Sequence, residues 1–259
     1  MATLYVTLQG KGGVGKSYLT SAFAQWLLEQ GRSVACIDTD TLNPTLLQYG
    51  PLKATHLKLS KDHVIDPRAL DDLVAIVAEA PDDGDVVVDV GSNGFETLMA
   101  YEVENGVFTL LQELGHRVVV QTVIAGGPDA EETVKGTMAL LAATDVPIIL
   151  WLNEHLGPLE IQSDGGVRPI ADASFLHDAR DRLVGTVLLP ARTKATFGKD
   201  VEEMLRQRLT FAEAIAQFDL MPRTRIKRIR DELWAQLAAL PLDDVAGTAE
   251  AAARAGASA

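Results

Sequence analysis

The stretch LQGKGGVGKS, residues 8–17, limits the possible folds more than any other part of the chain. It follows the β-branched and apolar run TLYVTLQ, and from Lys16 to Gln30 apolar side chains recur at helical spacing. A glycine-rich turn that joins a strand to a helix presents backbone N–H groups at a helix N-terminus, where phosphate groups bind. The chain is therefore expected to build a parallel α/β sheet with a phosphate site at the carboxyl end of its first strand.

Strand and helix patterns continue to alternate along the chain. Further strands are expected at SVACID, DVVVDV, RVVVQTV, PIILWLN and RLVGTVLLP. Helices are expected at residues 16–30, 67–79, 128–143, 194–208, 211–217 and 222–240. Alternation of this kind predicts the α/β class, with a mostly parallel, doubly wound sheet and helices on both of its faces.

Residues 1–240 are expected to form a single domain, because 259 residues with 47% hydrophobic content suit one α/β core. Within it, residues 153–173 break the alternation and predict an inserted hairpin that turns at residues 164–166. Residues 222–240 predict a C-terminal amphipathic helix with basic residues beside an apolar stripe. The small, low-complexity residues of 241–259 predict a disordered tail.

Composition limits the location and the partners of the protein. No apolar run approaches the roughly 20 residues that span a bilayer, and the first strand has no leader before it, so a cytoplasmic protein without membrane insertion is expected. The one cysteine, Cys36, excludes a disulfide framework. A net charge of −13 repels phosphate polymers, so the surface as a whole does not favour DNA binding.

Two phosphate-binding fingerprints overlap in the glycine-rich turn. Gly10, Gly12 and Gly15 match the dinucleotide pattern G-x-G-x-x-G, whereas Gly10, Gly15, Lys16 and Ser17 match the P-loop pattern G-x-x-x-x-G-K-[ST]. A pyrophosphate bridge needs close backbone approach but no lysine after the last glycine. Lys16 and Ser17 instead supply an ammonium for the β- and γ-phosphates and a hydroxyl for Mg²⁺. The sequence therefore favours a nucleoside triphosphate with Mg²⁺ over a dinucleotide.

Further along the chain, Asp89 supplies a carboxylate that a P-loop protein is expected to have. Asp89 closes the hydrophobic run DVVVD, where a P-loop protein holds Mg²⁺ and its waters. Asp89 alone could equally cap a strand end, and Asp38 at the end of the second strand suits the ribose of a dinucleotide. Because Asp89 and the P-loop occur together, the triphosphate interpretation is preferred. A dinucleotide oxidoreductase is kept only as a distant alternative.

The segment KGGVGKS resembles the deviant Walker A P-loop of the ATPase superfamily that includes MinD, the plasmid partition ParA proteins and the nitrogenase iron protein. The resemblance implies a MinD-like (SIMIBI) P-loop NTPase fold, slow hydrolysis of ATP to ADP with Mg²⁺, and a homodimer in the ATP state. It implies that Lys16 and Lys11 are both catalytic, with Lys11 reaching the phosphates of the partner subunit. There a second cation would offset transition-state charge, as an arginine finger does. Without the resemblance, Lys11 would be a solvated loop lysine.

The same resemblance implies roles for the remaining site residues. The D-x-D of CIDTD would orient the attacking water through Asp38 and Asp40. Taken alone, these two carboxylates could instead close turns at a strand end. Mg²⁺ would be held by Ser17, Asp40 and Asp89. Nucleotide contacts would come from Gly10, Gly12, Gly13, Val14, Gly15, Lys16, Ser17 and Tyr18, with Asn153 and the loop from about Pro190 to Phe197 at the adenine.

A narrower resemblance extends over nearly the whole chain. The blocks LQGKGGVGKS, CIDTD, VVVDVG, LLQELGH, WLNEHLGPLE and TFGKDVEEMLRQRLTFAEAI are similar to those of the TraL proteins of plasmid conjugation systems. The last two blocks lie outside the nucleotide motifs, so common descent among ATPases alone would not produce them. The resemblance implies an ATPase of plasmid conjugal transfer in the bacterial cytoplasm, with conjugation or relaxosome proteins as partners.

Two other functions remain open. A ParA-like partition ATPase would bind non-specific DNA, and the basic helix expected at 222–240 could provide the contact although the net charge disfavours it. A nucleotide-binding scaffold would recruit partners with negligible hydrolysis. Three departures from the superfamily pattern bear on nucleotide-driven switching. Tyr18 replaces a common threonine, Thr41 replaces a common proline, and VGSNG follows Asp89 in place of a proline pair.

Overall fold

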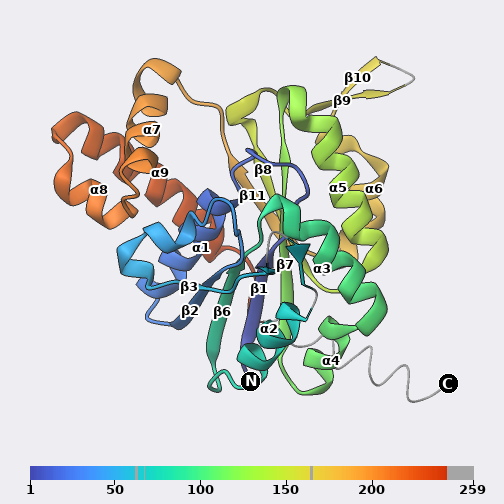
Figure 1. Cartoon of the computed structure of the whole chain (residues 1–259). Coiled ribbons are helices and arrows are strands. Elements are labelled where there is room, and N and C mark those ends of the chain that lie inside the picture. Colours follow the sequence, from blue (N-terminus) through green and yellow to red (C-terminus); the bar gives the residue numbers. More distant parts are fainter. Residues whose placement is uncertain (62–63, 67, 164–165, 244–259) are drawn as a thin grey trace.

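The computed structural model describes residues 1–61, 64–66, 68–163 and 166–243. Its centre is a seven-stranded sheet in the order β11-β8-β7-β1-β6-β2-β3, and every neighbouring pair runs parallel (Figure 1). The strands are β1 (Thr3–Thr7), β2 (Ser33–Asp38), β3 (Thr55–His56), β6 (Gly84–Asp89), β7 (Arg117–Ala125), β8 (Ile148–Asn153) and β11 (Leu183–Leu189). The predicted parallel α/β sheet is therefore confirmed, and β1 lies in its middle.

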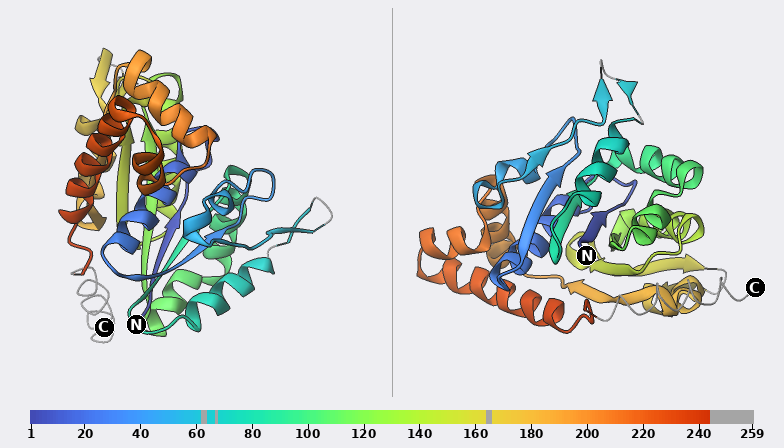
Figure 2. Two further views of the ribbon diagram at one scale, coloured as in Figure 1. Left: turned by 90° about the vertical axis from the view of Figure 1, so that its left-hand side faces the viewer. Right: turned by 90° about the horizontal axis from the view of Figure 1, so that it is seen from below.

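Helices cover both faces of this sheet (Figures 1 and 2). They are α1 (Lys16–Glu29), α2 (Ala69–Ala78), α3 (Ser92–Asn105), α4 (Val107–Glu113), α5 (Ala130–Ala143), α6 (Ser174–Asp178), α7 (Lys199–Arg206), α8 (Phe211–Gln217) and α9 (Leu220–Ala238). α1, α7, α8 and α9 share a hydrophobic cluster with one face, while α2, α3, α4 and α5 pack on the other. This is the doubly wound arrangement that the alternating pattern predicts.

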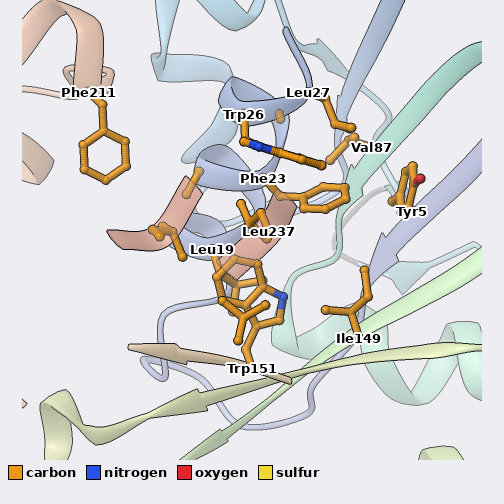
Figure 3. Close-up of a cluster of buried hydrophobic side chains, with 14 of the residues drawn as sticks. Tyr5, Leu19, Phe23, Trp26, Leu27, Val87, Ile149, Trp151, Phe211 and Leu237 are labelled. Carbon is orange, nitrogen blue, oxygen red and sulfur yellow. The ribbon is translucent and has the colours of Figure 1, made fainter. Parts of the chain in front are cut away.

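Successive side chains of β6 point alternately into the two halves of the core, one on each face of the sheet. Val87 points to the α1 face, whereas Val86 and Val88 point to the opposite face, as strand geometry requires. All three are buried, so this strand is covered on both sides. On the α1 face the rings of Tyr5 and Phe23 meet edge to face, with 4.8 Å between their centroids (Figure 3). This packing fixes β1 against α1, and with them the glycine-rich turn that joins the two elements.

Some helices differ from their predicted positions. The sequence does not predict α3 and α4, because Gly94 and Gly106 interrupt their apolar patterns and glycine lowers helix propensity. Gly106 adopts φ 60°, a left-handed conformation, and so ends α3 and begins α4. The helix predicted at 194–208 is a π-helix over Lys194–Gly198 followed by α7. Short π-helical turns recur at functional sites, and this one lines the pocket described below.

The remaining segments lie at the periphery. Residues 153–173 contain the antiparallel pair β9 (Glu160–Ser163) and β10 (Gly166–Pro169), which stands apart from the main sheet (Figure 1). Residues 164 and 165 of the predicted turn lie outside the described residues, as do residues 244–259 of the predicted tail. Leu242, also in that tail, is buried against the α1 face. A second antiparallel pair joins β4 (Ser60–Lys61) to β5 (Val64–Ile65). None of the described helices is long and apolar enough to cross a membrane.

Candidate functional site

The glycine loop, residues 9–17, connects the carboxyl end of β1 to α1. Gly13 and Gly15 have φ angles of 78° and 101°, so residues with a β-carbon would be strained at both positions. α1 begins at Lys16 without a side-chain cap and without an acidic residue in its first turn. The N–H groups of that turn therefore lack the partner that a cap provides, and they form an anion-binding end at the middle of the sheet.

The Lys16 side chain lies inside this loop. It is only 8% exposed, and its Nζ atom donates a hydrogen bond of 2.8 Å to the backbone carbonyl of Lys11. Burial lowers the pKa of Lys16, while the neighbouring Asp89 and Asp40 carboxylates raise it. A lysine ammonium can donate three hydrogen bonds, so Lys16 keeps capacity for an incoming anion.

Asp89 lies at the carboxyl end of β6, directly beside β1. Its carboxylate is buried, and Oδ1 lies 3.3 Å from the Thr20 hydroxyl. Burial, with a contribution from the Asp38 charge, raises the pKa of Asp89 to about 6, although hydrogen bonds from Ser17 and Thr20 and the charge of Lys16 lower it. The three residues that the sequence motifs identify thus lie in one cluster: Lys16, Ser17 and Asp89.

The raised pKa of Asp89 predicts a pH-dependent cost to stability. Because the folded pKa of about 6 lies above the unfolded value of 3.8, the folded state binds a proton more readily than the unfolded state between these values. The cost is therefore present above the folded pKa and disappears as the pH falls toward the unfolded one. Asp89→Asn should raise the free energy of unfolding of the nucleotide-free protein by roughly 1–3 kcal/mol at about pH 8, and by much less at about pH 5. Urea unfolding at both pH values measures this, and a variant less stable than the unaltered chain at the higher pH would contradict it.

The two carboxylates of the D-x-D motif organise the loop after β2. Asp38 is fully buried; its Oδ1 accepts the N–H of Asp40 at 2.9 Å, and its Oδ2 accepts those of Leu46 and Leu47 at 2.8 and 3.3 Å. These contacts match the turn-closing alternative for Asp38. The oxygen atoms of Asp38 are thus engaged with backbone donors.

Asp40 is only partly buried and faces the start of α3. Its Oδ1 accepts the N–H groups of Leu42 and Asn43, both at 2.9 Å. A β-carbon built on Gly91 would lie 2.8 Å from Asp40 Oδ2, so any larger residue there would displace the Asp40 carboxylate. Gly91 follows Asp89 by two residues, which brings the D-x-D loop and the loop after β6 into contact. Gly91 of the VGSNG sequence therefore lies directly against the Asp40 side chain.

An apolar cavity of about 230 Å³ opens beside the glycine loop, and we call it the side pocket. Asn153 at the end of β8 forms part of its wall; the side-chain Nδ2 donates to the Val14 carbonyl, and Oδ1 accepts the His155 N–H, both at 3.0 Å. Tyr18 forms another part of the wall and packs on Phe211, with 6.4 Å between ring centroids. The remaining wall includes Gly13, Gly15, Leu189, Pro190, Phe197 and Leu233. The sequence predicts Asn153 and the loop from about Pro190 to Phe197 at the base, and Tyr18 as a further nucleotide contact, but it misses the residues from α9.

Lys11 points away from the Lys16 cluster within its own chain. Its Nζ atom lies 2.8 Å from Glu132 Oε2 and 3.3 Å from Asp129 Oδ1, at the start of α5. The side chain is 29% exposed, and the two carboxylates raise its pKa. These partners of Lys11 are not predicted from the sequence, since acidic residues in the first turn of a helix are common without any lysine nearby.

The site and the fold can be compared with known proteins. The CobQ/CobB/MinD/ParA nucleotide binding domain matches residues 5–229. Protein TraL of Escherichia coli is 36% identical over 241 residues, which cover 92% of this chain and 98% of that protein. Protein MobD of Acidithiobacillus ferrooxidans is 28% identical over 158 residues, or 60% of this chain and 65% of MobD. The cell division ATPase MinD of Pyrococcus furiosus superposes with a TM-score of 0.50 at 15% identity, covering 90% of this chain and 98% of that one.

The likeness to MinD is one of fold, and it confirms the predicted MinD-like P-loop architecture. The family match includes both the glycine loop and Asp89. The likeness to TraL continues beyond these motifs over nearly the full length of both chains. This chain therefore belongs to the CobQ/CobB/MinD/ParA nucleotide-binding family and, within it, to the TraL proteins.

Proposed function

We propose that this protein is an ATP- and Mg²⁺-dependent ATPase of plasmid conjugal transfer that switches by ATP-dependent dimerisation. The observation that carries the proposal is the buried Lys16 ammonium at an uncapped helix N-terminus, with Asp89 on the adjacent strand. This combination suits a polyphosphate, because it supplies backbone donors, a cation and a carboxylate at one strand end. Membership of the TraL proteins supports the role in conjugation.

The residues of the site fit ATP and Mg²⁺. The N–H groups of residues 12–17 would hold the phosphates together with Lys16, and the side pocket would take the adenine between Tyr18, Asn153 and Pro190. The described residues include no group of three or more His, Cys, Asp and Glu side chains suited to a metal. Mg²⁺ would therefore need phosphate oxygens in addition to Ser17, Asp40 and Asp89. When bound, the ion would neutralise phosphate charge.

Each side chain then has a defined task in hydrolysis. Lys16 would stabilise charge on the β- and γ-phosphates from within the subunit. Asp40, the more exposed acid of the D-x-D motif, would orient the attacking water, and the buried Asp38 would hold the Asp40 loop in place. Lys11 of a second subunit would supply the additional cation, which would link hydrolysis to dimerisation.

A partition ATPase that uses non-specific DNA has weaker support. Three of the five basic residues of α9 form ion pairs within the chain: Arg225 pairs with Asp200, Arg228 with Glu232, and Arg230 with Asp231. A pair of this kind offers less free positive charge to a phosphate backbone, and the net charge is −13.

We therefore expect no ATP-dependent binding to a non-specific DNA duplex at about 0.15 M salt. Fluorescence anisotropy of a labelled duplex, with and without ATP and Mg²⁺, measures this. A salt-sensitive rise in anisotropy that requires ATP and is lost in Lys227→Ala, an exposed lysine of α9, would instead favour the partition function.

The proposed function is tested by measuring phosphate release and molar mass in solution, with ATP, ADP or no nucleotide. The proposal expects Mg²⁺-dependent phosphate release and a dimer with ATP alone. If ATP binds and recruits transfer proteins but phosphate release equals that of Lys16→Ala, the scaffold alternative is correct. If ATP does not bind, the proposed function is wrong.

A further inference from the structure

The start of the glycine loop is attached to α5 by buried contacts. Gln9 Nε2 donates to the carbonyls of Val123 at 2.9 Å and Thr133 at 3.1 Å, and Gln9 is 1% exposed. A β-carbon built on Gly136 would lie 2.2 Å from Gln9 Oε1, so a side chain at that position of α5 would displace the Gln9 amide. The first turns of α5 and the residues before Lys11 therefore form one packed unit.

At the surface, Lys11 adds a second contact between the glycine loop and the start of α5. Asp129 and Glu132 are three residues apart at the start of α5, so their side chains lie on the same side of the helix. Both carboxylates lie within 3.3 Å of the Lys11 ammonium. Asp129 is 26% exposed and Glu132 62% exposed, so solvent screens the two ion pairs and each one is weak.

The Lys11 peptide is also linked to the phosphate site, since its carbonyl accepts the hydrogen bond from Lys16 Nζ at 2.8 Å. A phosphate that draws the Lys16 ammonium toward itself removes this donor from Lys11. Nucleotide binding would thus loosen the backbone at Lys11, while its side chain remains held only by the two screened ion pairs.

We infer that Asp129 and Glu132 are positioning residues that retain the Lys11 side chain in its own subunit until a second, nucleotide-loaded subunit offers a stronger anion. The inference rests on the proposed function, in which Lys11 acts across a dimer. In the free subunit the two screened carboxylates hold the Lys11 ammonium. In a closed dimer interface, where water no longer screens the charge, the ammonium binds a triphosphate more strongly and leaves the carboxylates. Retention would therefore oppose dimerisation whenever ATP is scarce.

The test is the double variant Asp129→Asn/Glu132→Gln. Its half-maximal ATP concentration for dimerisation should fall about 3–10-fold, because the dimer no longer has to break the two ion pairs. The rate of phosphate release per dimer at saturating ATP should remain unchanged, since the carboxylates do not contact the reacting atoms. In the Lys11→Ala background the double substitution should have no effect on the ATP midpoint.

Glu131→Gln is the matched control. It removes one carboxylate from the same helical turn, but Glu131 pairs with Lys135 at 2.7 Å instead of Lys11. A second measurement uses the nucleotide-free monomer: acylation of Lys11 by an amine-reactive ester, followed by mass spectrometry. The acylation rate should rise several-fold in the double variant and stay unchanged in Glu131→Gln.

Equal ATP midpoints and equal Lys11 acylation rates in the unaltered chain and the double variant would overturn this inference alone. An effect of the double substitution that persists in the Lys11→Ala background would overturn it as well, because the carboxylates would then act through another group. If the unaltered chain forms no dimer with ATP, both the proposed function and this inference fail.

Discussion

Lys11→Ala should lower phosphate release by about 10³-fold while ATP affinity changes by no more than a few-fold. In the free subunit the Lys11 ammonium is bound to Asp129 and Glu132 and not to the Lys16 cluster, so its removal leaves the nucleotide site of that subunit intact. Its loss would lower the rate of hydrolysis only in the dimer, where a cation from the partner subunit stabilises the charge of the transition state. Arginine fingers that act in this way contribute about 10³–10⁵-fold to hydrolysis.

The measurement is a comparison of ATP binding by calorimetry with single-turnover phosphate release, for Lys11→Ala and for the unaltered chain. Lys135→Ala serves as the control, since Lys135 is an exposed lysine on α5 that pairs only with Glu131 among the described residues. Unchanged hydrolysis in Lys11→Ala would show that Lys11 is not catalytic. A parallel loss of ATP affinity would indicate that Lys11 acts on the nucleotide of its own subunit.

The second large effect is expected for Lys16→Ala, which should weaken ATP binding by about 10²–10³-fold. A hydrogen bond to a charged group contributes about 1.5–3 kcal/mol, and the Lys16 ammonium has more than one donor to offer a triphosphate. The contribution is large here because the ammonium is already buried within the glycine loop, so little side-chain freedom is lost on binding.

Titration with a fluorescent ATP analogue measures this loss, and the circular dichroism spectrum checks that Lys16→Ala is folded. Lys135→Ala is again the control, because it changes the net charge equally but lies on the exposed surface of α5. Binding of the analogue within three-fold of the unaltered chain, a small change on this scale, would contradict the assignment of the glycine loop as the phosphate site.

The first strand, the glycine loop and the start of α1 can be predicted from the sequence, because the residues that define them are neighbours in the chain. The glycine spacing, the lysine after it and the apolar strand before it all lie within residues 3–17, and backbone geometry alone converts them into a strand, a turn and an anion-binding helix end. Asp89 lies far along the chain, but parallel strands end at one edge of a sheet. Its position at the end of DVVVD therefore implied that it would lie near the loop.

Other features depend on tertiary contacts that no spacing reveals. The Lys11 contact with Glu132 joins residues 121 positions apart, through a helix whose acidic first turn has an ordinary explanation. The side pocket is built from segments of β8, β11, the π-helix and α9, and only their assembly creates its wall. The D-x-D motif allowed both a water-positioning and a turn-closing role. Burial, which the motif does not encode, distinguishes Asp38 from the more exposed Asp40.

The most direct test of Lys11 acting across a dimer is a mixing experiment with two inactive variants. Lys11→Ala keeps a complete nucleotide site but has no lysine to donate, whereas Asp40→Asn keeps Lys11 and retains an oxygen acceptor for Leu42 and Asn43. In a mixed dimer, one site combines its own Asp40 with the partner's Lys11. An equal mixture should therefore regain about one quarter of the unaltered rate of phosphate release, since half of the dimers are mixed and each has one complete site. The double variant Lys11→Ala/Asp40→Asn, which has neither group, should stay inactive. A mixture no more active than its separate components, although mixed dimers form, would contradict catalysis by Lys11 in trans.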